Sequence, residues 1–196
     1  MYLVFDTEAK DIMPDFRDNG VSYVGVFRSD EGVLKGYFED QLNNFLQDLQ
    51  DANEIVGYNI LGYDIPVLDR YFSFDWNSKK LVDIFMILVE EHGLYLKLDN
   101  IAHATLGEGK NAHGLEAVRF YKLGQLEKLK EYCDNDVDIT RRIYEFLVSN
   151  NCLYYFDGLG EKIRVDLNLN EYFKKKSNNS SKSNPDIEDA GGNGLF

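Results

Sequence analysis

An apolar run opens the chain, and its composition predicts a β-strand. Tyr2 to Phe5 are aromatic, β-branched or aliphatic residues, a mixture that favours extended backbone. Side chains alternate across a strand, so Asp6 and Glu8 should project from one face at its end. Two neighbouring carboxylates repel each other unless a cation lies between them. A strand end frayed into solvent is the structural alternative for this D-x-E pattern taken alone.

Strand and helix patterns then alternate along the chain. Strands over 21–27 and 33–38, separated by the turn-forming residues 29–32, predict a hairpin. Apolar residues at helical spacing predict helices over 40–52, 65–71, 84–91, 98–106 and 127–147, with short strands at 54–58, 80–82 and 162–165. This order indicates an α/β fold with a mixed sheet and helices on both faces. Ligands in such folds gather at the carboxyl ends of the parallel strands.

The composition changes near residue 168. We expect one domain over 1–167 and a low-complexity tail rich in Asn, Ser and Lys over 168–196, which should be disordered. The chain has no long apolar run and no visible signal peptide, so we expect no membrane association. Cys133 and Cys152 are too few for a disulfide scaffold, which favours a reduced, cytoplasmic setting. The net charge of −13 argues against a broad nucleic-acid-coating surface but not against an enzyme that grips a strand end.

Two further carboxylates stand in contexts that match Asp6 and Glu8. Asp64 lies at a strand-to-helix junction, where helix capping is the alternative role. Asp136 lies four residues after Tyr132 in the longest predicted helix, so both face the same way. An oxygen-only set of four carboxylates selects hard cations, Mg²⁺ or Mn²⁺, and two such ions can stabilise a phosphoryl displacement. Asp83, which precedes another helix, is expected to cap that helix rather than serve as a fifth ligand.

These segments resemble, in order and spacing, the motifs of the DEDD superfamily of 3′–5′ exonucleases, which have a ribonuclease H-like fold. Phe5-Asp6-Thr7-Glu8 is similar to the first motif. The segment from Gly57 to Pro66 resembles the second motif as it occurs in proofreading domains of family B DNA polymerases. Tyr132-x-x-x-Asp136 resembles the third motif in its tyrosine form (DEDDy); the histidine form would need His where Glu131 stands. No segment resembles a polymerase domain, so the chain is more similar to the stand-alone exonucleases of this group.

The resemblance implies a five-stranded mixed sheet with one antiparallel strand and a two-metal-ion exonuclease. Two Mg²⁺ ions, with Mn²⁺ able to substitute, would be held by the four carboxylates Asp6, Glu8, Asp64 and Asp136. Tyr132 would hold the attacking water or help to deprotonate it. The expected reaction is hydrolysis of the terminal phosphodiester, which releases a nucleoside 5′-monophosphate.

The resemblance also suggests residues that bind the substrate. Phe5, Thr7 and Tyr63 could contact the terminal nucleotide, with core packing as the alternative for the two aromatic residues. Asn59 either orders the turn of the second motif or touches substrate. The expected partner is the 3′ end of a nucleic acid, single-stranded or frayed, with DNA favoured and RNA possible. A role in DNA repair is the matching expectation.

Two questions stay open at this point. A helicase, polymerase or sliding-clamp partner is a further expectation. The terminal Gly194-Leu195-Phe196 resembles a clamp-docking peptide, and a terminus without function is the alternative. The alternative function is a catalytically weak, nuclease-like module that binds or docks nucleic acid. The presence of all four carboxylates and the tyrosine favours the enzyme.

Overall fold

The main sheet of the protein has five strands. The computed structural model describes residues 1–108 and 115–180. The strand order is β3-β2-β1-β4-β5. The bounds are β1 (Tyr2–Ala9), β2 (Val21–Arg28), β3 (Val33–Phe38), β4 (Glu54–Gly57) and β5 (Lys80–Asp83). β2 runs antiparallel to β1 and β3, whereas β4 is parallel to both β1 and β5. The mixed sheet with one antiparallel strand predicted from the sequence is therefore confirmed.

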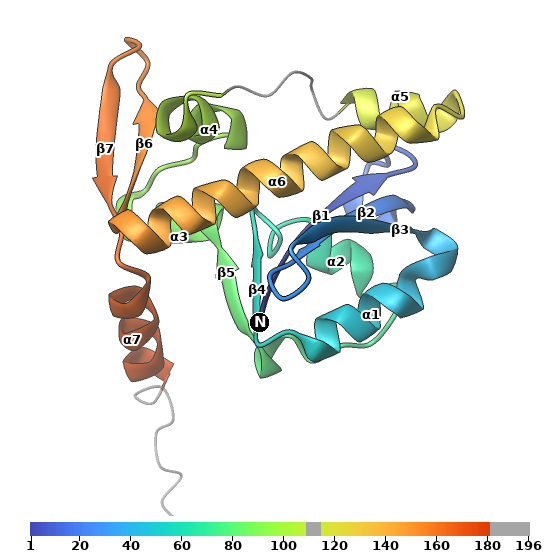
Figure 1. Ribbon diagram of the computed structural model, residues 1–196, viewed down its shortest axis with the longest axis horizontal. Coiled ribbons are helices and arrows are strands. Elements are labelled where there is room, and N and C mark those ends of the chain that lie inside the picture. The colour runs from blue at the N-terminus through green and yellow to red at the C-terminus, as the bar shows by residue number, and fades with distance from the viewer. Residues whose placement is uncertain (109–114, 181–196) are drawn as a thin grey trace, which may run out of the picture.

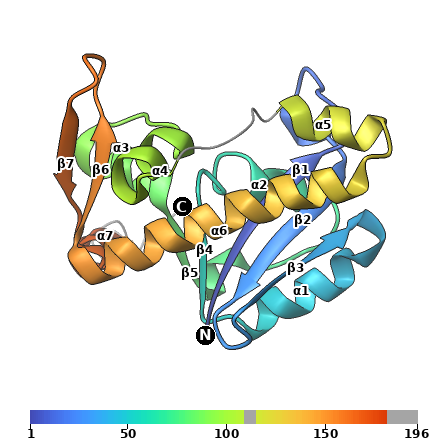
Figure 2. The same ribbon diagram turned by 45° about the horizontal axis from the view of Figure 1, so that its top comes forward.

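Helices cover both faces of this sheet (Figures 1 and 2). They are α1 (Leu42–Asp51), α2 (Asp64–Leu68), α3 (Ile84–His92), α4 (Leu98–Leu106), α5 (Leu115–Lys122), α6 (Leu126–Asn150) and α7 (Leu169–Ser180). The long helix α6 lies across one face, over β1 and β2, while α1 and α2 lie on the opposite side of the sheet (Figure 2). The helix α6 therefore covers the middle of the sheet on that face.

Alternation along β1 divides the core between the two faces. Leu3 and Phe5 belong to the cluster that contains Phe45 of α1, whereas Val4 belongs to the cluster under α6 with Val137. Because side chains in a strand alternate with a period of two, residues 6 and 8 share the α6 face with Val4. The fold thus turns the acidic end of β1 toward the long helix.

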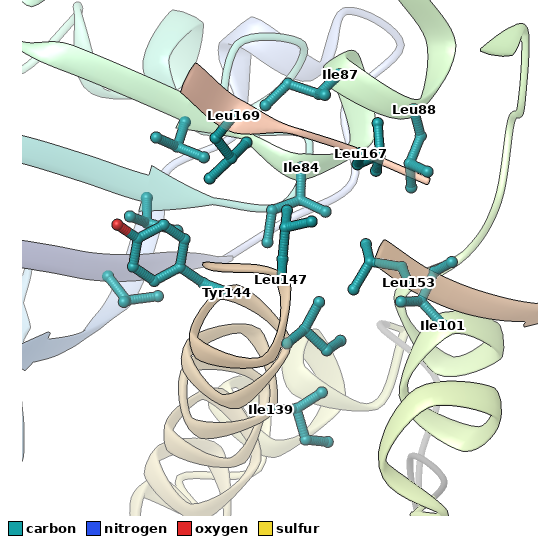
Figure 3. Packing of buried hydrophobic residues seen from close by; sticks show 14 of the residues in the cluster. Ile84, Ile87, Leu88, Ile101, Ile139, Tyr144, Leu147, Leu153, Leu167 and Leu169 are labelled. Atoms are coloured by element: carbon teal, nitrogen blue, oxygen red, sulfur yellow. The ribbon is translucent and has the colours of Figure 1, made fainter. Parts of the chain in front are cut away.

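The carboxyl-terminal half of α6 is anchored in the larger core cluster. Figure 3 shows Ile139, Tyr144 and Leu147 of α6 packed with Ile84 of α3 and with Leu153. Leu153 belongs to a second, antiparallel sheet formed by β6 (Cys152–Phe156) and β7 (Lys162–Asp166), and β6 packs against α4. This packing anchors the carboxyl-terminal half of α6, while Cys133 in the amino-terminal half contacts Asp6 near the end of β1.

The expectation of disorder from residue 168 onward differs from the structure. Leu169–Ser180 form α7, in which Leu169 and Tyr172 are buried against the main core and the Tyr172 hydroxyl donates to Glu90 Oε2 at 2.6 Å. The polar composition of this segment hides these two apolar anchors. Residues 181–196, which include Leu195 and Phe196, lie outside the described residues.

Two other elements, β6 and α5, were not predicted from the sequence. α5 lies at the amino-terminal end of α6 (Figure 1). Within the part of the chain that the structure describes, no helix has the length and apolar character needed to cross a bilayer.

Candidate active site

Asp6 and Glu8 come together with a cysteine that the sequence analysis did not single out for the site. One ligand atom from each of Asp6, Glu8 and Cys133 lies within 4.8 Å of the other two. Cys133 Sγ lies 3.4 Å from the carbonyl oxygen of Asp6 and 3.7 Å from its Oδ2. Burial raises the pKa of the Cys133 thiol, and the charges of the two carboxylates raise it further. The thiol is therefore neutral and donates its proton toward Asp6.

A glycine permits this close approach of helix and sheet. Gly25 of β2 pairs with Asp6 in the ladder, on the face that α6 covers. A Cβ at Gly25 would come within 3.0 Å of both Cys133 Sγ and Val137 Cγ2. Any larger residue would push α6 away from the end of β1. Glycine within a strand is a signal for such a close approach, so this feature was readable in the sequence.

Asp64 is tied to β1 through Thr7. The parallel pairing of β4 with β1 ends at Val56 and Val4, which leaves the N–H of Thr7 beyond the ladder. Asp64 Oδ1 accepts from this N–H at 2.8 Å and from the Thr7 hydroxyl at 2.5 Å. Asp64 is the first residue of α2, and its side chain binds β1. In the structure, Asp64 therefore links α2 to β1 instead of capping a helix.

Burial controls the protonation of Asp64. The side chain is 3% exposed, and burial raises its pKa to about 7, against the lowering effect of the two hydrogen bonds from Thr7. The nearby charge of Asp83 also raises this pKa. A bound cation would favour the charged form of this carboxyl.

Asp83 organises the turn that leads to Asp64. It caps α3, as predicted, with Oδ1 accepting from Met86 N at 3.2 Å. The same oxygen accepts from Asn59 N at 2.8 Å, and Oδ2 accepts from Leu61 N at 2.9 Å. Asn59 has a φ of 64°, a left-handed conformation that asparagine tolerates better than most residues. Asn59 therefore orders the turn, and its contact with substrate stays a prediction.

Tyr132 and Asp136 lie on the buried side of α6, as their spacing predicted. Tyr132 is 9% exposed and packs in a small cluster with Ala117 of α5 and Tyr23 of β2. Asp136 is 4% exposed and follows Cys133 by three residues, about one helical turn. The hydroxyl of Tyr23 donates to Asp134 Oδ1 at 3.3 Å, which links β2 directly to α6.

The four predicted carboxylates are therefore arranged in two ways. Asp6 and Glu8 belong to the group within 4.8 Å, whereas Asp64 and Asp136 lie outside it. Asp64 is connected to that group through Thr7, which lies between Asp6 and Glu8 in β1. Asp136 is connected through Cys133, on the same helix.

The structure corrects one of the expected substrate contacts. Phe5 is 1% exposed and packs against Phe45 and Trp76, because strand alternation turns it away from Asp6. It is a core residue. Thr7 is 7% exposed, and both of its donors are used by Asp64.

Tyr63 has a more open setting than Phe5. It is half-buried, and its hydroxyl accepts a hydrogen bond from Asn19 Nδ2 at 2.8 Å. Its ring stacks on Phe16, which belongs to the loop after β1. Neither Asn19 nor Phe16 was singled out in the sequence, because the loop that contains them has no recognisable motif.

The donor set of this site fits a divalent cation. Asp6 and Glu8 present two carboxylates to one small volume, and hard cations prefer such oxygen ligands. Without a cation, the like charges of these partly or fully buried groups would destabilise one another. The site could therefore hold a divalent metal ion.

Comparison with known proteins identifies the family. Residues 3–148 match the model of the RNase_H superfamily. The chain belongs to this ribonuclease H superfamily. The expected ribonuclease H-like fold is thus confirmed, and membership of the superfamily supports nuclease activity with a divalent metal.

One solved structure has a similar fold. The family B DNA polymerase from the hyperthermophilic archaeon Pyrobaculum calidifontis is similar in structure, with a TM-score of 0.59, 22% sequence identity and coverage of 74% of this chain. The chain spans 24% of that polymerase, so the likeness concerns the fold of one part of it. No curated protein matched the chain.

Proposed function

We propose that this member of the ribonuclease H superfamily is a metal-dependent 3′–5′ exonuclease. It would hydrolyse the terminal phosphodiester bond of nucleic acid, with DNA favoured and RNA possible. The observation that carries the proposal is the pair of carboxylates, Asp6 and Glu8, gathered beneath α6 at the carboxyl end of β1. Parallel strands in α/β folds present their ligand sites at this end.

The carboxylates would serve as ligands for two divalent ions. Asp6, Glu8, Asp64 and Asp136 would hold Mg²⁺, with Mn²⁺ able to replace it. When bound, the ions supply Lewis-acid stabilisation of the charge that develops on the phosphoryl group. Thr7 contributes by fixing the orientation of Asp64 with two hydrogen bonds, so that this carboxylate needs no reorganisation when it binds.

Tyr132 would position the attacking water. A free tyrosine has a pKa near 10, so its phenol stays protonated at neutral pH and acts through a hydrogen bond. The water oxygen would attack the terminal phosphorus, and the bond from phosphorus to the 3′ oxygen of the preceding nucleotide would break. That 3′ oxygen takes up a proton, and a nucleoside 5′-monophosphate leaves.

The test compares single-stranded DNA and RNA oligonucleotides labelled at the 5′ end. Intact protein is incubated with Mg²⁺, Mn²⁺ or EDTA, beside an Asp6→Asn/Glu8→Gln variant and a Tyr132→Phe variant. We expect a metal-dependent ladder that shortens from the 3′ end, absent in the double variant and at least tenfold slower with Tyr132→Phe. The exposed Glu161→Gln serves as the matched control and should behave like the intact protein.

Two outcomes would contradict the proposal. Retained binding without shortening would favour a nucleic-acid-binding or docking module. Shortening that survives in the double variant would assign the activity to other residues or to a contaminant.

A further inference from the structure

A loop with exposed apolar side chains follows directly after the acidic end of β1. Residues 10–20 are closed at the base by a hydrogen bond from Lys10 N to Gly20 O at 2.7 Å. Ile12, Met13 and Phe16 are exposed to 63%, 46% and 37%. The loop begins two residues after Glu8, and Lys122 of α5 forms an ion pair with its Asp11 (Figure 2, blue loop beside α5). The loop therefore lies beside the end of β1 that contains Asp6 and Glu8.

The aromatic ring of Phe16 is held in a fixed position within this loop. It stacks on Tyr63 with ring centroids 5.3 Å apart and an interplanar angle of 26°. Asn19 is 4% exposed and locks the arrangement, since its Nδ2 donates to the Tyr63 hydroxyl and its Oδ1 accepts from Met13 N, each at 2.8 Å. A preorganised aromatic surface loses little entropy when a ligand binds it.

This stacked pair adjoins the candidate metal ligands. Tyr63 directly precedes Asp64 in the chain, and Asp64 is bonded to Thr7 between Asp6 and Glu8. The phenol ring of Tyr63 therefore adjoins the segment that links α2 to the acidic end of β1.

Within residues 1–108 and 115–180, the cations around the loop offer little free positive charge. Four of them are within ion-pair distance of a carboxylate: Lys10 with Glu39, Arg17 with Asp15, Arg70 with Asp18 and Lys122 with Asp11. The chain as a whole has a net charge of −13. Attraction for the phosphate backbone is therefore weak here, and base stacking is the remaining source of affinity for a single strand.

We propose that the exposed side of Phe16, backed by Tyr63, is a stacking platform for an unpaired nucleobase at the 3′ end of the substrate. The inference rests on the proposed exonuclease function and adds a specificity determinant to it. A base can reach this platform only when it is unstacked and unpaired, so single strands and frayed ends are selected over paired ends. The protein then recognises the end through base surface more than through phosphate charge.

The test measures the affinity of the protein for fluorescent single-stranded oligonucleotides of 12 nucleotides, in the presence of Ca²⁺. The oligonucleotides end in either a normal or an abasic 3′ nucleotide. The variants are Phe16→Ala, Phe16→Leu and Phe16→Trp, with Leu159→Ala, exposed at the tip of the β6–β7 hairpin, as the matched control. We expect Phe16→Ala and Phe16→Leu to weaken binding of the normal end about tenfold, in the range for one stacked base. Phe16→Trp and Leu159→Ala should bind like the intact protein. The intact protein should bind the abasic end about tenfold less tightly, and Phe16→Ala should lose no further affinity for it.

Salt dependence gives a second readout. If few phosphates are contacted, the slope of log affinity against log salt should stay below about 2, since each phosphate on a single strand contributes about 0.7. A steep slope, or normal binding by Phe16→Ala, would overturn the platform. Normal binding by Phe16→Leu, with weaker binding by Phe16→Ala, would indicate general apolar contact instead of stacking and would overturn the platform. If Phe16→Ala alters sedimentation while nucleic-acid binding is normal, the loop is a protein-docking surface and the inference is wrong.

Failure of the platform can be separated from failure of the nuclease. Hydrolysis of bis(p-nitrophenyl) phosphate, a diester that lacks a base, tests the metal-dependent chemistry of the intact protein alone. Hydrolysis by the intact protein together with normal oligonucleotide binding by Phe16→Ala would leave the nuclease standing and remove the platform. No hydrolysis, together with a binding defect in Phe16→Ala, would keep the platform and remove the nuclease.

Discussion

Gly25 of β2 lies directly beneath Cys133 of α6, so close that a methyl group on Gly25 would come within 3.0 Å of Cys133 Sγ. We predict that Gly25→Ala lowers the free energy of unfolding by about 1–3 kcal/mol, the usual cost of overpacking. The exonuclease rate should also fall under conditions in which the variant remains folded, because the displaced helix contains Tyr132 and Asp136. Thermal melts and exonuclease rates measure the two effects.

A double variant tests the cause of this effect. Cys133→Ala removes the sulfur that the new methyl group would meet, so Gly25→Ala/Cys133→Ala should be less destabilised than the sum of the single variants. Gly158→Ala is the control, since nothing lies within 4 Å of its Cβ position. Strict additivity of the two single changes would contradict the proposed contact.

Thr7→Val removes one of the two donors to Asp64 and keeps the shape and strand preference of the side chain. Hydrogen bonds to charged groups contribute about 1.5–3 kcal/mol, so we expect the affinity for Mn²⁺ to fall roughly tenfold or more. Calorimetric titration of the protein with Mn²⁺ measures this loss. Thr105→Val, which loses hydrogen bonds to the backbone of Tyr154 instead, should lower the melting temperature with unchanged Mn²⁺ affinity.

The raised pKa of Asp64 predicts how the metal-free protein responds to pH. Its folded value of about 7 lies above the unfolded value of about 3.9, so the folded state binds more protons between these limits. The free energy of unfolding should therefore fall as the pH rises from about 4 to 7. Denaturant titrations in EDTA should show this slope, and Asp64→Asn should reduce it.

Part of the slope should remain in that variant, because burial also raises the pKa of Asp83 and of Asp134. A profile for Asp64→Asn that superimposes on that of the intact protein would show that Asp64 titrates normally. Saturating Mn²⁺ should flatten the profile of the intact protein, since a cation holds the carboxyl in its charged form.

The helix α7 predicts where the domain can be shortened. A chain that ends at residue 168 loses the buried side chains of Leu169 and Tyr172, each worth about 1.5–3 kcal/mol. It should melt at a lower temperature than a chain that ends at residue 180. Tyr172→Phe, which removes only the hydroxyl bonded to Glu90, should cost about 1 kcal/mol. If the two shortened chains had the same melting temperature, α7 would add no stability and the domain would end at residue 167.

Much of the sheet was readable from the sequence, because alternating and helical patterns report local burial. The pattern predicted Asp6 and Glu8 on one face of β1 and Tyr132 and Asp136 on one side of α6, and the structure agrees. Contacts between distant segments leave no such pattern. The Thr7–Asp64 bond and the position of Cys133 depend on how far β4 extends and on where α6 crosses the sheet. The core position of Phe5, which the sequence left open, and the unexpected α7 have the same explanation: contacts with distant segments decide whether a side chain is buried.

The position of α6 in the chain has a consequence for protein synthesis. The ribosome makes the strand with Asp6 and Glu8 before the long helix, and Asp136 follows Asp6 by 130 residues. Until the long helix has left the exit tunnel and docked over Gly25, the nascent chain has an incomplete set of carboxylates and lacks Tyr132. If the proposed function holds, the active site would stay incomplete beside the messenger RNA and the ribosome during most of the synthesis of this domain.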